Sequence, residues 1–540
     1  MAEQRGQGLE ETSQLEWQQV APHVVGERTL LETPFGTRPL VYADYTASGR
    51  SFAPIESFIR EQVLPYYANT HSESSLTGRQ TNRLREEARD IIKRCVNAGP
   101  EHAVIFCGSG ATAAINRLID ILGLRTPQAE RTVVFIGPYE HHSNELPWRE
   151  AEVELVTIPL DETGALDIEV LEQELRRHQG SARILASFSA ASNVTGLKTD
   201  TARVSELVHR YGGHVFWDYA AAAPYLRIDV QDKDAVFISP HKFLGGPGTP
   251  GLLIVRRSLV HNRVPAVPGG GTVSFVGPDF HHYLADCEHR EEGGTPGIVE
   301  AIRAGLVFKL QETVGTDEIE RREYELVSRA LERWGKHPNI RILGNPELPR
   351  LSIVSLQLHR GGDQLHYAYI VALLNDLFGI QARGGCSCAG PYGHSLLGIS
   401  AKESRALDRE VARGNTVLRP GWLRLNFNYF IDEETFEYLL RAVELVAELG
   451  WQMLPAYRYD RDSGTWIHRQ GPVSLPVSLD GFDPRTDASA KAATCQSPLS
   501  AYLAQAQEEL ESAAELPACS VLELDESAER MRWFFLPEAC

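Results

Sequence analysis

The chain has 540 residues, which suits two or three domains, and its 43% hydrophobic and 23% charged residues are typical of a globular protein. The formal net charge of -19 argues against a nucleic-acid surface, which needs clustered Lys and Arg, and the short apolar runs exclude a membrane span. The polar N-terminus has no apolar secretory core, so we expect a cytoplasmic location.

From about residue 100 to residue 260, short apolar runs alternate with helical patterns. Near-continuous apolar strands separated by helices indicate an α/β fold, with a mostly parallel sheet that is covered on both faces. Ligands of such sheets bind outside the carboxyl ends of the strands. The predicted strands are 103–106, 132–138, 182–190, 214–220, 235–239 and 251–257, and the predicted helices are 111–122, 166–178 and 201–212.

After about residue 315 the pattern indicates a smaller α+β unit. The segment between residues 388 and 424 predicts an extended surface loop, and the chain beyond residue 457 is polar, with one more helix at 505–516. The other predicted elements are helices at 319–336, 366–378 and 433–454 and strands at 350–358 and 422–430. We expect an N-terminal extension at 1–37, a large domain at 38–310, a small α+β domain at 311–456 and an appendage at 457–540.

The stretch ISPHKFLGGPG at 238–248 places Lys242 at the end of a predicted strand. Glycines and a proline follow the lysine and enforce a tight turn. A lysine in this position lies where ligands bind, and burial or a neighbouring cation lowers its pKa and frees its amine as a nucleophile. The alternative is a lysine that only caps a turn, and the local pattern favours neither.

Two further features favour a ligand site. Asp218 stands at the carboxyl end of the strand that precedes the Lys242 strand, and a carboxylate is the usual partner of a pyridinium nitrogen. The turn Gly108-Ser109-Gly110 opens a helix, and the N-terminal amides of a helix bind phosphate. Such a turn alone is an ordinary loop, but the three features together predict a pyridoxal-phosphate site.

A second short stretch, RGGCSCAG at 383–390, contains Cys386 and Cys388. The chain's 8 cysteines are scattered, which argues against a disulfide framework, and one Cys-x-Cys pair supplies at most half of a zinc site. The residues alone leave three readings open: metal ligands, a redox pair, or a nucleophile and its neighbour. The glycines around the pair fit a loop that moves.

Residues 38–455 resemble the class V aminotransferase-like family of fold type I pyridoxal-phosphate enzymes. Within that family the chain is most similar to the cysteine desulfurase and selenocysteine lyase branch. The motifs that carry the resemblance are, in chain order, YADYTASGR, FCGSGATAAIN, YEHHSNELPW, ASNVTG, WDYAAAAP, SPHK and PGGGTV. The resemblance implies pyridoxal 5'-phosphate as cofactor, a large mostly parallel-sheet domain with a smaller α+β domain, and a homodimer.

The resemblance also implies a role for each motif residue, and it implies no metal ligand. Lys242 is the catalytic lysine that binds the cofactor, His141 stacks on the cofactor ring, and Asp218 pairs with the ring nitrogen. Cys388, five residues after Arg383, is the catalytic cysteine. Further implied cofactor contacts are Ala111, Thr112, Asn193, Ser239, His241 and, across a dimer interface, Thr272; the implied substrate contacts are Ala47, Asn193, Arg383 and Arg424.

The implied reaction converts the small amino acid L-cysteine into L-alanine and leaves a persulfide on Cys388 for a sulfur-acceptor protein. Arg383 would favour the reactive thiolate. Ala221 stands where the family usually has a glutamine that touches the ring hydroxyl. The alternative is therefore another class V reaction, namely selenocysteine lysis, epimerisation or transamination. In that case Cys388 would be dispensable. A third hypothesis, a non-catalytic scaffold, needs neither Asp218 nor Lys242.

Overall fold

The computed structural model describes residues 15–70, 72–471, 473, 475–485, 493–517 and 522–537. Residues 1–14 of the expected N-terminal extension and parts of the expected appendage lie outside these ranges. Among the described residues, no helix combines the length and the apolar character that a membrane span requires.

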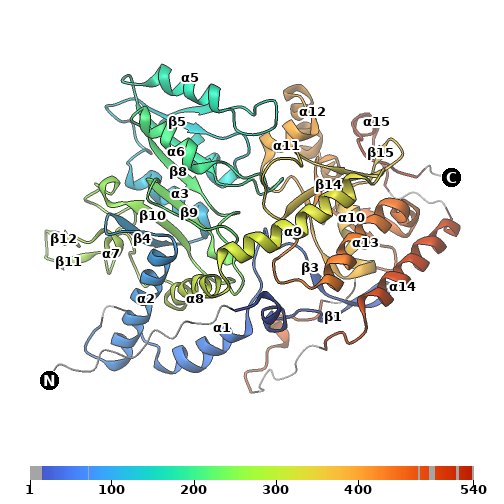
Figure 1. Cartoon of the computed structure of the whole chain (residues 1–540), viewed down its shortest axis with the longest axis horizontal. Coiled ribbons are helices and arrows are strands. Elements are labelled where there is room, and N and C mark those ends of the chain that lie inside the picture. The colour runs from blue at the N-terminus through green and yellow to red at the C-terminus, as the bar shows by residue number, and fades with distance from the viewer. Residues whose placement is uncertain are drawn as a thin grey trace.

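A seven-stranded sheet forms the centre of the larger unit (Figure 1). Its strands are β4 (His102–Cys107), β10 (Gly251–Arg256), β9 (Ala235–Ile238), β8 (His214–Asp218), β7 (Arg183–Ser189), β5 (Thr132–Ile136) and β6 (Glu154–Thr157), in spatial order. Within this sheet β10 runs antiparallel to both neighbours, and the other pairs are parallel. The predicted α/β fold with a mostly parallel sheet is confirmed.

Both faces of this sheet are buried, because successive side chains of a strand point to opposite faces. In β4, Val104 enters one cluster of buried apolar side chains and Ile105 enters the other. Helix α3 packs Leu118 into the second cluster, while α6 packs Val208 into the first. The helices of this unit are α1 (Ala53–Phe58), α2 (Leu76–Cys95), α3 (Gly110–Ile121), α4 (Leu146–Arg149), α5 (Ile168–His178), α6 (Thr201–Arg210), α7 (Cys287–Arg290) and α8 (Ile298–Val314).

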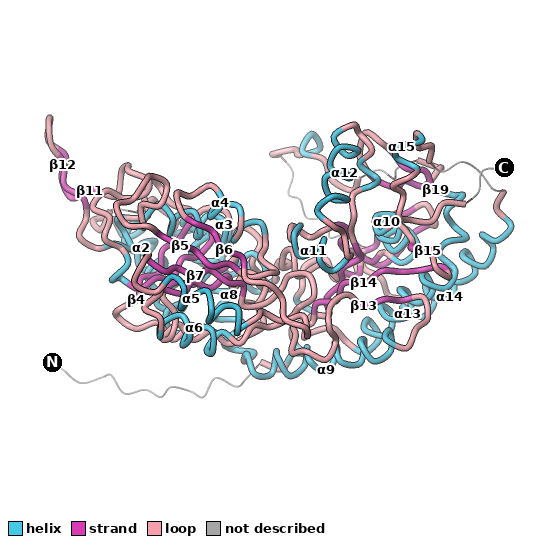
Figure 2. The backbone as a smooth tube through the Cα atoms, turned by 90° about the horizontal axis from the view of Figure 1, so that it is seen from above, coloured by secondary structure: helices cyan, strands magenta, loops and turns pink. Residues whose placement is uncertain are grey.

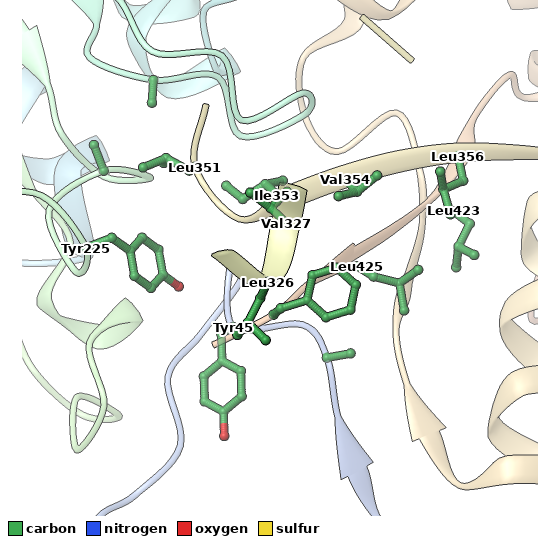
Figure 3. Packing of buried hydrophobic residues seen from close by; sticks show 14 of the residues in the cluster. Tyr45, Tyr225, Leu326, Val327, Leu351, Ile353, Val354, Leu356, Leu423 and Leu425 are labelled. Atoms are coloured by element: carbon green, nitrogen blue, oxygen red, sulfur yellow. The ribbon is translucent and has the colours of Figure 1, made fainter. Parts of the chain in front are cut away.

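The smaller unit contains an antiparallel sheet in the order β13-β14-β18-β17. Its strands are β13 (Ile340–Ile342), β14 (Ile353–Arg360), β15 (Asp363–Gln364), β17 (Arg383–Gly385) and β18 (Trp422–Asn426), and its helices include α9 (Thr316–Gly335), α10 (Tyr367–Phe378) and α13 (Glu433–Leu449). Helix α9 extends from one unit to the other (Figure 2). Its Leu326 and Val327 lie in the same buried cluster as Ile353 and Leu425 (Figure 3).

The N-terminal segment joins the smaller unit before it enters the larger one. Strands β1 (Leu30–Thr33) and β2 (Gly36–Pro39) form a hairpin, and β3 (Val41–Tyr42) pairs in parallel with β16 (Ile380–Gln381). Because β16 directly precedes β17, this pairing brings the YADYTASGR segment beside the cysteine stretch.

The predicted extended loop after Cys388 is wrong. The structure has α11 (Gly390–Leu397) and α12 (Ala401–Ala412) in this segment. Helix α11 is terminated by Gly398, which follows its last residue and has the left-handed conformation. Helix α12 begins with a capping box between Ser400 and Glu403. The sequence carries both signals, and they define a helix end and a helix start two residues apart.

The chain after residue 457 packs against the smaller unit. Strands β19 (Tyr457–Asp460) and β20 (Thr465–His468) form a hairpin, and α14 (Leu499–Ser512) begins six residues before the predicted helix at 505–516. Tyr457, Trp466, Leu510 and Phe534 belong to the main buried cluster. This segment therefore contributes to the core of the smaller unit.

Candidate active site

The candidate site is a cavity of about 240 Å³ at the carboxyl ends of the parallel strands, where open α/β sheets bind ligands. Strands β7, β8 and β9 are in register here, so Ser189 lies beside Asp218. The small unit contributes Arg383, Cys388 and Arg424 to the lining. The other sequence-predicted residues that line the cavity are Ala47, Ala111, Thr112, His141, Asn193, Asp218, Ser239, His241 and Lys242.

Thr272 is absent from the residues that line this cavity. Its hydroxyl donates a hydrogen bond of 2.7 Å to the carbonyl of Gly269, and its side chain is buried in the loop before β11 (Val273–Val276). Strand β11 and its partner β12 (His281–Tyr283) project from the larger unit (Figure 2). A single chain does not bring Thr272 to the other predicted residues.

Lys242 follows β9 in a short 3-10 turn, Pro240–Lys242, and lines the cavity. The chain then folds back closely: a β-carbon at Gly246 would lie 2.1 Å from the carbonyl oxygen of Pro240, so this position requires glycine. Burial is the main cause that lowers the pKa of Lys242, to about 8. The negative charge of Asp218 raises this pKa, and the positive charge of Arg424 lowers it further. About a tenth of the amine is therefore neutral, and hence nucleophilic, at pH 7.

We expect the cofactor-free protein to capture pyridoxal phosphate at a rate that rises with pH and reaches half its maximum near pH 8. Only the neutral amine reacts, and an ordinary lysine would become neutral near pH 10.4. Stopped-flow absorbance of the cofactor at a series of pH values measures the rate. A midpoint above pH 10 would show that Lys242 has the environment of a surface lysine.

Asp218 ends β8 and is 4% exposed. Its Oδ1 accepts a hydrogen bond of 2.8 Å from the Ala220 amide, which fixes the orientation of the carboxylate. Burial raises the pKa of Asp218, whereas the Ala220 amide and Lys242 lower it. A cationic ring nitrogen would supply the positive partner that a buried carboxylate needs.

His141 is held in position by its own loop and by a buried carboxylate. Its Nδ1 accepts the Ser143 amide at 3.1 Å, and burial followed by Lys242 lowers its pKa to about 3, so its ring is neutral. The preceding Glu140 accepts the Asn144 side-chain amide at 2.6 Å and the Ser189 hydroxyl at 2.6 Å. Glu140 thus joins the His141 loop to β7, a role that the sequence interpretation missed.

The start of α3 forms a small polar cradle with the Lys242 turn. The Ala111 amide donates to Ser239 Oγ at 2.8 Å, and Thr112 Oγ1 lies 2.6 Å from Ser143 Oγ. Gly110 has a φ of 57°, and a β-carbon there would lie 2.8 Å from Ser239 Oγ. Glycine therefore keeps the cradle open. Hydroxyls and helix N-terminal amides are the donors that phosphate requires, so these residues fit a phosphate group.

The cysteine stretch forms a tight turn beside the cavity. The Ala389 amide donates to the Cys386 carbonyl at 3.1 Å, and the two central residues, Ser387 and Cys388, have φ values of 52° and 56°. The left-handed conformation costs roughly 1–2 kcal/mol for each residue that is not glycine. Both cysteines are exposed, and of the two only Cys388 is part of the cavity lining. Among the described residues, no group of three potential metal ligands includes either cysteine.

The two predicted arginines share a carboxylate that the sequence interpretation missed. Asp44 accepts Arg424 Nη2 at 2.8 Å and Arg383 Nε at 2.9 Å, and Arg424 Nη1 donates to the Asn193 carbonyl at 3.1 Å. Strand pairing places Arg383 opposite Arg424. Asp44 therefore orients both guanidinium groups at the cavity. The position of Asp44 in the YADYTASGR motif was the one sequence feature that could have identified it as a site residue.

Residues 41–409 match the family described as Aminotransferase class-V. A protein called "Probable cysteine desulfurase" from Halalkalibacterium halodurans is 30% identical over 368 residues, 67% of this chain and 87% of that protein. One with the same name from Staphylococcus aureus is 29% identical over 374 residues, 68% of this chain and 87% of that protein.

The apo structure of cysteine desulfurase from Thermococcus onnurineus NA1 superimposes with a TM-score of 0.64 at 26% identity, over 76% of this chain and 95% of that one. The fold described above agrees with these comparisons. The chain belongs to the aminotransferase class-V family and is a pyridoxal 5'-phosphate-dependent enzyme of fold type I.

Proposed function

We propose that this enzyme is a cysteine desulfurase, which converts L-cysteine into L-alanine and leaves the sulfur as a persulfide on Cys388. The observation that carries the proposal is the position of Cys388, which lines the same cavity as Lys242, Asp218 and Arg424. The names of the two bacterial relatives and of the Thermococcus structure support it.

In this proposal the bound cofactor supplies a conjugated ring that accepts the electron pair left when the Cα–H bond of the substrate breaks. Lys242 would hold the cofactor, and its Nζ would take the Cα proton of the substrate. Asp218 would pair with the ring nitrogen and keep it protonated, and His141 would pack against the ring. Ala111, Thr112, Ser239 and His241 hold the phosphate.

Cys388 performs the sulfur transfer. Its thiolate attacks the substrate sulfur, so that a new S–S bond forms while the Cβ–S bond breaks. The electron pair of the broken bond goes to Cβ, which takes up a proton. Lys242 would return a proton to Cα, and the product leaves as alanine. The sulfur atom stays on Cys388 as a persulfide, and no external oxidant or reductant is needed at this stage.

Arg424 binds the substrate carboxylate in this proposal, next to Asp44. Replacing Arg424 with lysine should raise KM for L-cysteine by about 10- to 100-fold with a smaller change in kcat, because a single ammonium group loses the bidentate geometry of the guanidinium. Steady-state alanine formation measures both constants. The exposed Arg405→Lys is the matched control, and an Arg424→Lys enzyme with unchanged KM would remove Arg424 from the substrate site.

Ala221 favours a second candidate function, another class V reaction such as selenocysteine lysis, epimerisation or transamination. Its small side chain lines the cavity where the family usually has a glutamine, which leaves room for a different substrate. The two functions are separated by incubating the holoenzyme with L-cysteine, L-selenocysteine and other L-amino acids and by quantifying alanine and keto acids. Alanine from cysteine supports desulfuration, whereas turnover of another amino acid alone supports the second candidate.

The proposal extends to the partners of the enzyme. We propose a cytoplasmic homodimer in which Thr272 of the partner subunit contacts the cofactor phosphate, and a sulfur-acceptor protein that takes the persulfide sulfur. The domain boundaries expected from the sequence, with a cofactor domain at 38–310 and a small domain at 311–456, belong to the same proposal.

A further inference from the structure

His142 connects the large unit to the turn that carries Cys388. It lies directly after His141, and its backbone amide donates to the Cys388 carbonyl at 2.8 Å. On the other side of the turn, the Gly390 amide donates to His142 Nε2 at 3.0 Å. One residue of the large unit thus bonds the backbone on both sides of Ala389, across 248 positions of the sequence.

The packing at Gly390 fits this contact. A β-carbon at Gly390 would lie 3.2 Å from His142 Nε2, so a larger residue would push the imidazole away. The hydrogen bond also requires that Nε2 carries a lone pair, which assigns the ring proton of a neutral His142 to Nδ1. Helix α11 begins at Gly390, so the same bond fixes the first residue of that helix.

The turn needs such support because its backbone is unfavourable. Ser387 and Cys388 are both in the left-handed region, and Ser387 Oγ is buried with no hydrogen-bond partner among the described residues. A third bond, from Asn193 Nδ2 to the Ser387 carbonyl at 2.7 Å, also comes from the large unit. Contacts with the large unit therefore hold the turn in a conformation that its own residues disfavour.

We propose that His142 is a positioning residue, a latch that holds the Cys388 turn against the cavity and whose release lets the turn move away. The strain in the turn opposes the bonds to His142, so the released state is a minor state that lies close enough in free energy to be populated. In the latched state Cys388 faces the cavity, and in the released state it is free to meet an acceptor. The significance of this movement for sulfur transfer rests on the proposed function, whereas the latch itself does not.

The test is hydrogen–deuterium exchange with mass spectrometry on the full-length holoenzyme without substrate. His142→Leu removes the acceptor for the Gly390 amide, so peptides covering residues 386–391 should exchange about five- to tenfold faster. His142→Gln places an amide oxygen near the position of Nε2 and should restore exchange to within about twofold of the wild type. His394→Leu, on the same helix α11, is the control and should leave these peptides unchanged.

A second variant tests the strain independently. Ser387→Gly removes both the left-handed penalty and the unpartnered hydroxyl, so the double variant His142→Leu with Ser387→Gly should exchange several-fold more slowly than His142→Leu alone. Wild-type exchange rates in His142→Leu would overturn the proposal, as would equal acceleration in His142→Gln.

The kinetic consequence separates the latch from the proposed function. If the enzyme is a desulfurase, His142→Leu should lower kcat for alanine formation several-fold and leave KM for L-cysteine unchanged, because Arg424 is not disturbed. Faster exchange with no alanine formation in any variant, the wild type included, would keep the latch and reject the desulfurase activity.

Discussion

Replacing Lys242 with alanine is expected to lower alanine formation from L-cysteine by at least about 1,000-fold. Lys242 has two tasks in the proposed mechanism, since it holds the cofactor and then moves the Cα proton. The alanine side chain performs neither task, and no second lysine is found among the residues that line the cavity. The measurement is steady-state alanine production, with the cofactor content of each preparation determined from its absorbance after denaturation.

The control for this variant is Lys309→Ala, which removes an exposed lysine from α8 and should retain wild-type activity. Lys242→Ala protein that still folds, judged by circular dichroism, and that still forms alanine at more than about a tenth of the wild-type rate would contradict the assigned role. A Lys242→Ala protein that forms no alanine but keeps full biological activity would instead revive the scaffold hypothesis, because it would separate the biological role from catalysis.

Replacing Cys388 with serine is expected to reduce alanine formation from L-cysteine by about 1,000-fold or more. A hydroxyl is a poor nucleophile at its own pKa, and the proposed step needs a thiolate that attacks the substrate sulfur. Cofactor binding and its absorbance should not change, because Cys388 lies in the small unit and the predicted cofactor contacts lie in the large one. Alanine assays and absorption spectra of the same preparation check both expectations.

Cys386→Ser is the matched control, since it changes a cysteine of the same turn that does not line the cavity. We expect this variant to keep most of its activity. If Cys388→Ser is fully active toward an amino acid other than cysteine, the second candidate function is correct and Cys388 is dispensable. If Cys386→Ser is the inactive variant, the roles of the two cysteines are reversed.

The sequence predicted the large unit well because its strands are continuous apolar runs. Residues at the ends of such strands, such as Asp218 and Lys242, must lie at one edge of a parallel sheet, so the apolar pattern alone brings them together. The motif resemblance then supplied roles for residues that no periodicity assigns, including Asn193 and His241.

The missed features depend on contacts between distant parts of the chain. Asp44 is 380 positions from Arg424, and His142 is 248 positions from Gly390, so no local pattern joins them. Helix α2 was not predicted from the sequence, for a related reason. Its buried face includes Arg85 and Arg89, whose partner is the buried Glu292, and a buried charged residue does not register in an apolar periodicity.

The most direct test of the central claim is mass mapping of sulfur on the protein itself. The holoenzyme is incubated with L-cysteine, alkylated to trap persulfides and digested, and the peptide that contains Cys386 and Cys388 is fragmented, while alanine is quantified in the same reaction. We predict one additional sulfur atom on Cys388 and, in a single turnover, one alanine per persulfide. The desulfurase account would be contradicted if protein that retains its cofactor formed no alanine and if both cysteines remained unmodified.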